Sequence, residues 1–243
     1  GYDIIFFWVV RMMFSGLKFM DEAPFHTTLI NGIVRDSQGR KISKSLNNGT
    51  DPIEVIDEYG ADALRYMLIS GTATGNDTRF SMERVESARN FANKLWNASR
   101  FVLSSLEEAP AELTGEEDLT MADRWILSEL NLAITDITDS LEKSELGMAA
   151  DRALDFAWGS YCDWYIELSK KKLYAGDATV RTVLWTVLKD LLKLMHPFMP
   201  FITEEIWQSV PGADGNLVVA SWPELRQVDQ TDLDAMETIM SAI

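Results

Sequence analysis

Apolar side chains recur at helical spacing over most of the chain beyond Ser81. They fall at positions i, i+3 and i+4, which places them on one face of an α-helix. The pattern predicts four long helices, over residues 82–106, 121–142, 146–173 and 178–195. Short links join consecutive helices, so we expect them to pack as an antiparallel bundle.

Shorter elements are predicted around these helices. The run His196-Pro-Phe-Met-Pro200 interrupts the fourth helix, and Thr203 is placed to cap a short fifth one. Apolar residues from Leu233 to Ile243 begin a further amphipathic helix. An acidic segment containing Pro110 and Gly115 is typical of a linker between the first and second long helices.

The first 80 residues have a mixed pattern. An apolar, helix-like run extends from Ile4 to Phe19, and the segment from Thr27 to Val34 predicts a β-strand. A helix follows with Asp51 as its N-cap and Gly60 at its end, and a second short helix covers 62–69. Residues 72–77 are the expected hinge. We therefore expect a mostly α protein, with a small α/β part before the bundle.

The charge of the chain limits which partners it can bind. The formal net charge is -16, but residues 107–123 contribute -7 and residues 224–243 contribute -4. Residues 35–45 are locally +3. Because neutralisation of phosphates dominates non-specific binding to nucleic acids, a tight non-specific polyanion binder is excluded. A selective RNA binder is not excluded.

Cysteine and histidine counts exclude two further classes of protein. One cysteine and two histidines, in 243 residues, allow neither a disulfide framework nor a zinc cluster. No apolar stretch approaches the ~20 residues that a membrane-spanning helix needs. We expect a monomer in a reducing, cytoplasmic setting. His26 is expected in a loop, His196 at the end of its helix, and Cys162 as a small buried apolar residue.

The most informative segment is the loop after the predicted strand. Lys41, Ser43, Lys44 and Ser45 alternate ammonium groups with small hydroxyl donors. Two positive charges on long stems, with hydroxyls between them, suit a polyphosphate. The alternative is a solvated basic turn with no ligand.

Three blocks of sequence resemble the valyl-tRNA synthetases in order and spacing, and a fourth, from His196 to Trp207, resembles a signature that the valine, isoleucine and leucine enzymes share. These are Gly1-Tyr-Asp-Ile-Ile-Phe-Phe-Trp-Val-Val-Arg-Met12, the lysine loop, Arg89-Asn-Phe-Ala-Asn-Lys-Leu-Trp-Asn-Ala-Ser-Arg-Phe101 and His196-Pro-Phe-Met-Pro-Phe-Ile-Thr-Glu-Glu-Ile-Trp207. The segment Lys41-Ile-Ser-Lys-Ser45 matches the KMSKS loop of class I synthetases, with Ile42 in place of the usual Met. Ser221-Trp-Pro-Glu224 extends the similarity.

The resemblance implies an enzyme that joins valine to tRNA(Val) through valyl-adenylate, using ATP with Mg²⁺. Lys44, and after it Lys41, would neutralise the departing pyrophosphate and act as catalytic residues. The implied ATP-binding residues are Gly32, Lys41, Ile42, Ser43, Lys44 and Ser45. Asp3, Ile4 and Trp8 match the amino-acid pocket, although Asp3 could instead cap a helix and Trp8 could lie in the core. The sequence offers no protein ligand for the metal.

The resemblance also implies a division of the chain. Residues 1–80 would be the last part of the catalytic domain, and residues 81–243 the anticodon-binding bundle. The HIGH motif and the editing domain are missing, so we expect essentially no aminoacylation by this chain alone. Two positions depart from the family pattern, Asn31 where His is usual and Leu46-Asn47 where Lys-Gly is common.

Several alternatives remain open from sequence. Arg84, Arg89, Lys94 and Arg100 suit a tRNA-facing surface, and a solvated helix face explains them equally well. Lys170 to Lys172 need only the dipole of a helix C-terminus. The rival functions are an isoleucyl-tRNA synthetase, a stand-alone tRNA-binding module and a helical scaffold with no RNA partner.

Overall fold

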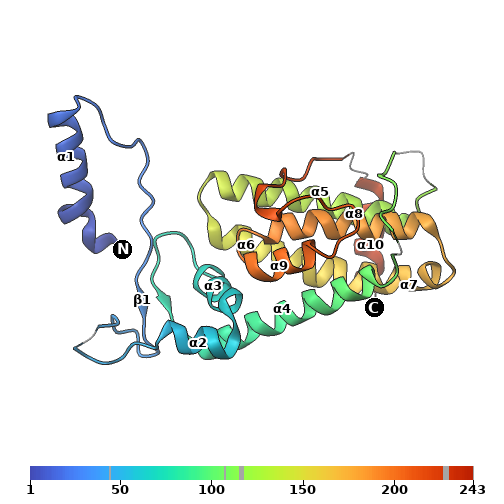
Figure 1. Cartoon of the computed structure of the whole chain (residues 1–243), viewed down its shortest axis with the longest axis horizontal. Helices are drawn as coiled ribbons and strands as arrows, with labels where there is room; N and C mark the ends of the chain where they lie inside the picture. The colour runs from blue at the N-terminus through green and yellow to red at the C-terminus, as the bar shows by residue number, and fades with distance from the viewer. Residues whose placement is uncertain (44, 107, 115–117, 227–229, 243) are drawn as a thin grey trace.

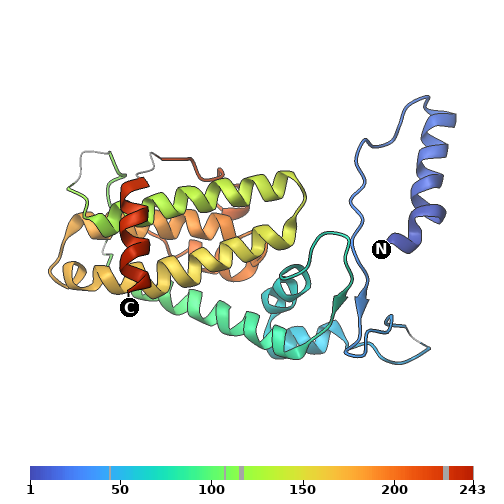
Figure 2. The same ribbon diagram turned by 180° about the vertical axis from the view of Figure 1, so that it is seen from behind.

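The computed structural model describes residues 1–43, 45–106, 108–114, 118–226 and 230–242. The chain begins with a helical arm, formed by a 3-10 turn at Tyr2–Ile4, a π turn at Ile5–Val9 and α1 at Val10–Phe19. The helix expected over this apolar run is therefore confirmed. The arm stands apart from the main body of helices (Figures 1 and 2). Its large apolar side chains are exposed, with Phe6 at 80% and Phe19 at 78%.

The strand predicted from Thr27 to Val34 is wrong over most of its length. Strand β1 covers Val34–Arg35 and pairs in parallel with β2, Thr78–Arg79, in the register Val34 to Thr78. A strand exists only where a second backbone pairs with it. Among the described residues, no ladder partner lies beside 27–32, so this stretch stays outside any sheet.

The next two helices form as their end signals predict. Asp51 caps α2, Pro52–Tyr59, by accepting a hydrogen bond from the backbone of Ile53 at 2.9 Å. Gly60 has a φ of 91°, a value that favours glycine, and it turns the chain into α3, Ala61–Ile69. Both helices pack against the start of α4, and buried Val55 and Tyr66 join the main core.

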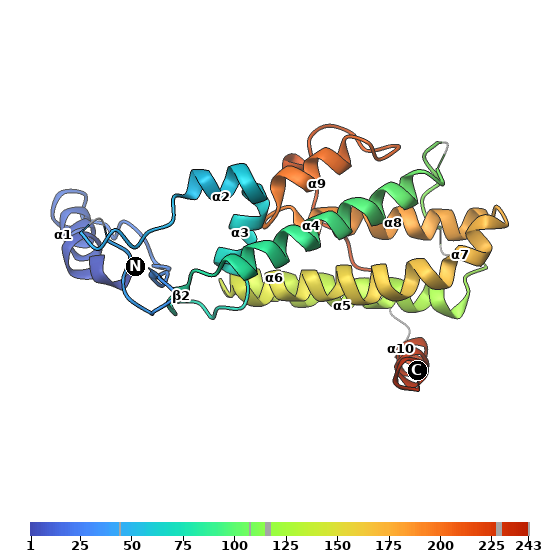
Figure 3. The same ribbon diagram turned by 90° about the horizontal axis from the view of Figure 1, so that it is seen from below.

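The bundle consists of α4, Met82–Leu103, α5, Met121–Glu142, a long rod over 146–174, and α8, Ala178–Met195. Ser81, Thr120 and Asp177 cap the N-termini of α4, α5 and α8. Figures 1 and 3 show α4, α5, the rod and α8 side by side, joined by turns at alternate ends. The core lies between them, and its largest fully buried side chains include Phe91, Ile126, Phe156 and Leu188.

The rod is one continuous helix with a wider middle. It runs from α6, Leu146–Asp155, through a π-helical segment, Phe156–Tyr165, into α7, Ile166–Tyr174. Two buried tyrosines on the π segment anchor the rod to its neighbours. Tyr161 donates its hydroxyl to the carbonyl oxygen of Leu184 at 2.9 Å, and Tyr165 donates to Asp123 at 2.6 Å.

The short helix after the proline-rich run does not begin where the sequence predicts. α9 covers Pro200–Trp207, so Thr203 lies inside it and does not cap it. The cap comes from α3, because the Asp62 carboxylate accepts hydrogen bonds from the backbones of Phe201, at 3.3 Å, and Ile202, at 2.7 Å. Pro at the first helical position needs no donor partner, which favours the earlier start.

The C-terminal residues pack against one side of the bundle. A 3-10 turn at Leu217–Val219 precedes α10, Gln230–Ser241, which crosses α5 (Figure 2). Arg124 on α5 holds Asp232 on α10 through two contacts, at 2.7 and 3.0 Å. Ile243, and Gly115 of the predicted linker, lie outside the described residues. None of the described helices is both long and apolar enough to cross a membrane.

Candidate functional site

The lysine loop rests on a turn organised by one carboxylate. Asp36 accepts hydrogen bonds from the backbones of Gln38, at 3.0 Å, and Arg40, at 2.8 Å, and from the Arg40 guanidinium at 2.8 Å. Gly39 has a φ of 79° and closes the turn. Hydrogen bonds, the largest from Asn48, hold the pKa of Asp36 at about 2. The turn thus presents Lys41 at the start of the loop.

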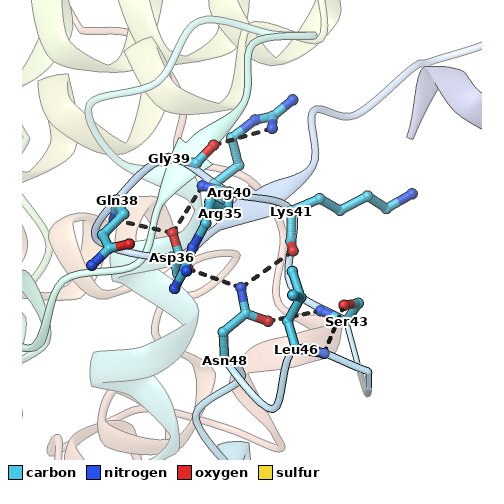
Figure 4. A network of polar contacts seen from close by, with 9 residues as sticks. All are labelled: Arg35, Asp36, Gln38, Gly39, Arg40, Lys41, Ser43, Leu46 and Asn48. Carbon is cyan, nitrogen blue, oxygen red and sulfur yellow. Dashed lines mark hydrogen bonds and ion pairs between the residues drawn. The ribbon is translucent and has the colours of Figure 1, made fainter.

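Asn48 connects the two ends of the loop, as Figure 4 shows. Its amide nitrogen donates to Asp36 at 2.8 Å and to the carbonyl oxygen of Lys41 at 3.3 Å. Its amide oxygen accepts from the backbone N–H of Ser43 at 3.0 Å. The Ser43 hydroxyl lies 3.2 Å from that of Ser45. Sequence reasoning missed both Asp36 and Asn48, although an Asp followed by Gly three residues later is a turn signal.

The loop and the N-terminal arm meet at an ion pair. The Lys41 ammonium lies 2.7 Å from the Asp3 carboxylate, and both side chains are about half exposed, at 55% and 42%. The hydrogen bond from Lys41 is the largest cause that lowers the pKa of Asp3. Asp3 is therefore negatively charged near neutral pH and holds an alkylammonium group.

A second ion pair, between Arg35 and Asp77, lies next to this junction and also connects to the arm. Asp77 accepts from the backbone of Ile33 at 2.8 Å and from the Arg35 guanidinium at 2.5 Å. Arg35 also donates to the Tyr2 hydroxyl at 3.2 Å, which links the arm to β1. Gly32 lies so close to Asn76 that a Cβ atom would come within 1.8 Å of its carbonyl oxygen. Gly32 is therefore needed for this close backbone approach.

The remaining predicted site residues are more exposed or lie outside the described part of the chain. Ile4 is 44% and Trp8 58% exposed, so the alternative of Trp8 in the core is not seen. The four cavities of about 180 to 530 Å³ described for this part of the chain are lined by other side chains. Lys44, the first candidate for catalysis, lies outside the described residues. The described residues also contain no cluster of His, Cys, Asp or Glu that could hold a metal ion.

The basic series on α4 divides into two pairs. Arg84 donates to the carbonyl oxygens of Met67, at 3.2 Å, and Ser70, and so it fastens α4 to the end of α3. Lys94 pairs with Asp163 and lies 3.9 Å from the centre of the Trp158 ring. Both of these cations serve contacts within the chain.

Arg89 and Arg100 are exposed instead. Arg89 lies 5.9 Å from the centre of the Tyr59 ring. Arg100 borders a cavity of about 530 Å³ between α4 and α9, which Trp96, Phe101 and Ile206 also line. An exposed guanidinium next to aromatic rings can bind a phosphate and stack with a base.

Four other residues make contacts that serve the structure of the chain. The His196 ring lies 2.8 Å from the Thr203 hydroxyl at the junction of α8 and α9, and burial lowers its pKa. Cys162 is half-buried, and burial raises the pKa of its thiol to about 12. Lys170 pairs with Glu167 at 2.6 Å, and Lys172 pairs with Asp177 at 3.4 Å near the end of α7. All four are consistent with the structural alternatives named from sequence.

Comparisons with known proteins match both parts of the chain. The family model of class I tRNA synthetases (I, L, M and V) matches residues 1–81, and that of the anticodon-binding domain of tRNA ligase matches 123–243. The valine–tRNA ligase of Clostridium tetani is 57% identical over 232 residues, which is 93% of this chain and 26% of that protein. The valine–tRNA ligase of Carboxydothermus hydrogenoformans is 54% identical over 99% of this chain and 28% of its own length.

Solved structures share the fold. A LeuRS of Agrobacterium radiobacter K84, in a ternary complex with tRNA and LeuAMS, matches 92% of this chain and 27% of its own with a TM-score of 0.73 at 26% identity. Methionyl-tRNA synthetase of Mycobacterium tuberculosis matches 72% of this chain and 36% of its own with a TM-score of 0.60 at 23% identity, which concerns the fold alone. This chain spans about a quarter of the length of the valine–tRNA ligases that it matches.

Proposed function

We propose that this chain, which belongs to the class I tRNA synthetases, acts within an ATP-dependent valine–tRNA ligase, where it supplies the lysine loop and the anticodon-binding helices. The observation that carries the proposal is the contact between Asp3 and Lys41. It joins the residue expected to bind the amino acid to the residue expected to meet the triphosphate.

In this proposal, the loop acts on the activation step. The carboxylate of valine attacks the α-phosphorus of ATP, valyl-adenylate forms, and the bond to pyrophosphate breaks. Negative charge grows on the departing pyrophosphate, so an ammonium positioned there stabilises the transition state more than the bound substrate. Lys41 and Lys44 are the proposed catalytic residues. Ile42, Ser43, Ser45 and the backbone at Gly32 are proposed to border the nucleotide.

The amino acid is proposed to bind beside the N-terminal arm. Asp3 already holds a primary ammonium group at 2.7 Å, which is the chemistry that the α-ammonium of valine needs. Ile4 and Trp8 would limit the volume of the side chain. An apolar pocket separates substrates that differ by one methylene by only about 1–3 kcal/mol, a limit for which the valine and isoleucine synthetases are themselves the established example. Selection by these two side chains is therefore modest.

Magnesium is expected to arrive with ATP. Among the described residues no carboxylate cluster suits the ion, and oxygen ligands from ATP and water are its usual alternative. None of the described residues is therefore assigned to the metal.

Residues 1–80 are proposed to belong to the catalytic unit, and residues 81–243 to bind tRNA(Val). Of the four basic candidates on α4, Arg89 and Arg100 are the more exposed, which favours them as tRNA contacts over Arg84 and Lys94. The expectation of a cytoplasmic monomer stays a prediction, which sedimentation of the full-length enzyme would test for the oligomeric state.

Amino-acid-dependent exchange of pyrophosphate into ATP by the full-length enzyme tests the proposal. We expect valine to support exchange far better than isoleucine, and Lys44→Ala to slow it with little change in the KM for valine. Lys41→Ala should slow it as well, and the KM for valine should also change because this substitution frees the Asp3 carboxylate. Preference for isoleucine would favour the rival synthetase. Full exchange after both lysines are replaced would overturn the proposed role of the loop.

A further inference from the structure

We infer that Asn48 is a positioning residue for amino-acid activation, because its side chain fixes the backbone from which Lys41 extends. The inference rests on the proposed function and adds to it a residue that makes no contact with substrate. Its basis is the set of three hydrogen bonds that join Asn48, at the far end of the loop, to Asp36, Lys41 and Ser43 at its beginning.

The partners of Asn48 fix the orientation of its amide. Asp36 and the Lys41 carbonyl can only accept hydrogen bonds here, and the backbone N–H of Ser43 can only donate. The amide must therefore point its nitrogen toward the first two and its oxygen toward the third. No charged side chain can satisfy all three partners, because a carboxylate lacks the donors and an ammonium lacks the acceptor.

The contacts lie on both sides of Ile42. One bond fixes the carbonyl group of Lys41, and another fixes the N–H group of Ser43. Together they hold the backbone between these two residues in a single conformation. Arg35 and Lys41 also form an antiparallel bridge at the start of the loop. Without Asn48, water would replace these bonds and the loop would sample many conformations. A misplacement of about 1 Å can slow catalysis on the order of 100-fold.

Asp36 makes this arrangement rigid. It is only 9% exposed, and Asn48 is one of several donors that converge on its carboxylate together with the backbones of Gln38 and Arg40. The turn and the loop therefore share one buried acceptor. Hydrogen bonds of this kind also keep the pKa of Asp36 low, so that the acceptor stays ionised at neutral pH.

The neighbouring residue provides a matched control. Asn47 is exposed, has a φ of 45° and makes no side-chain hydrogen bond with the part of the chain that the structure describes. Asn47→Asp and Asn48→Asp are the same chemical change, one residue apart in the same loop. Only the second places a carboxylate against Asp36 and the Lys41 carbonyl.

The test measures pyrophosphate exchange by the full-length enzyme carrying Asn48→Ala, Asn48→Asp or Asn47→Asp. We expect Asn48→Ala to lower kcat by roughly 10- to 100-fold, as a loop displaced by about 1 Å would. The KM for valine should change little, and Asn47→Asp should behave like the unsubstituted enzyme. A wholly structural role for Asn48 would lower the fraction of active enzyme, which titration of active sites measures, and would leave kcat per active site unchanged.

The pH profile of Asn48→Asp gives a second readout. Protonation of the introduced carboxyl restores a donor toward Asp36, so its activity relative to the unsubstituted enzyme should rise as the pH falls. Asn47→Asp should show no such recovery. This comparison decides the inference even if Asn48→Ala does not fold.

Amide hydrogen exchange at Ser43 distinguishes a failure of the inference about Asn48 from a failure of the proposed function. We expect Asn48→Ala to speed this exchange in the chain of 243 residues. If exchange speeds up while kcat stays unchanged, the inference is overturned and the proposed function stands. If the unsubstituted full-length enzyme shows no valine-dependent pyrophosphate exchange, the proposed function fails and the inference fails with it.

Discussion

The Lys41 ammonium and the Asp3 carboxylate, 38 residues apart in sequence, lie 2.7 Å from one another. This contact lowers the pKa of Asp3 below its ordinary value of 3.8. Because the folded-state pKa is below the unfolded one, the contact stabilises the folded chain above pH 3.8 and its contribution is lost as the pH falls through the lowered pKa.

We expect Lys41→Met to return the pKa of Asp3 toward 3.8. The carboxyl carbon shift of Asp3, followed by NMR through an acid titration, measures this change. Lys18→Met is the control, because Lys18 lies on the same N-terminal arm as Asp3 and makes no contact with it that we find. This substitution should leave the titration of Asp3 unchanged. An equal midpoint with and without Lys41 would show that the two groups do not interact in solution.

Arg84 is expected to contribute to stability. Arg84→Met removes a charged donor from the carbonyl oxygens of Met67 and Ser70, and hydrogen bonds that involve a charged group contribute about 1.5–3 kcal/mol. Urea unfolding should therefore show a fall of that order in the free energy of unfolding. Arg89→Met, which lacks those contacts, should lower it by no more than about 1 kcal/mol. Equal losses would contradict this assignment.

Arg100 is expected to act on tRNA binding and not on stability. If it contacts a phosphate as proposed, Arg100→Ala should weaken binding of tRNA by the full-length enzyme and reduce the slope of log K against log salt by about 1. Unfolding should be unchanged, because Arg100 is exposed and forms no ion pair among the described residues. Lys143→Ala is the control for a general loss of positive charge. An unaltered salt slope would exclude a phosphate contact at Arg100.

Asp62 joins two helices that lie far apart in sequence, because it caps α9 from α3. Asp62→Ala leaves two backbone N–H groups without their acceptor and should lower the free energy of unfolding by about 1–2 kcal/mol. The exposed Asp57→Ala is the matched control on α2 and should have little effect. The measurement is equilibrium unfolding in urea, and a null result would mean that water replaces this cap.

The same carboxyl predicts a dependence on pH. Burial raises the pKa of Asp62, so the folded chain binds more protons than the unfolded chain above pH 3.8. The contribution of Asp62 to the free energy of unfolding should therefore fall as the pH rises from 3.8 through the raised pKa. Asp62→Asn should lose this part of the dependence.

Cys162 is expected to be chemically inert in the folded chain. Burial raises the pKa of its thiol from 9.0 to about 12, so the reactive thiolate is about a thousandfold rarer at a given pH. Alkylation by iodoacetamide at about pH 8 should be correspondingly slow and should speed up in urea. Because the chain has one cysteine, the reaction reports this site alone. Rapid alkylation in the native state would show that the thiol is accessible.

The long helices are predictable because their signals are local. Their apolar stripes and capping residues set boundaries that the structure reproduces, as in α5, Met121–Glu142, and α8, Ala178–Met195. Predicted and observed helix boundaries agree because side chains three or four residues apart lie on one helix face, and this spacing does not depend on residues elsewhere in the chain.

Features that depend on distant partners were not predictable in this way. The strand expected at 27–34 is short because its pairing with 78–79 covers two residues, and the cap of α9 comes from Asp62, about 140 residues earlier. The lysines of the loop stood out by charge alone. The contacts of Asn48 depend on how the loop folds back on the turn at Asp36, and no periodic pattern in the sequence predicts that conformation.

The π-helical segment Phe156–Tyr165 has a consequence for evolution by insertion and deletion. Removing one residue there would tighten the segment toward α geometry, and the larger turn per residue would offset the residue lost. The side of α7 that faces its neighbours would therefore change little. Related sequences should tolerate a one-residue deletion in this segment better than one within α5 or α8, where nothing offsets the rotation.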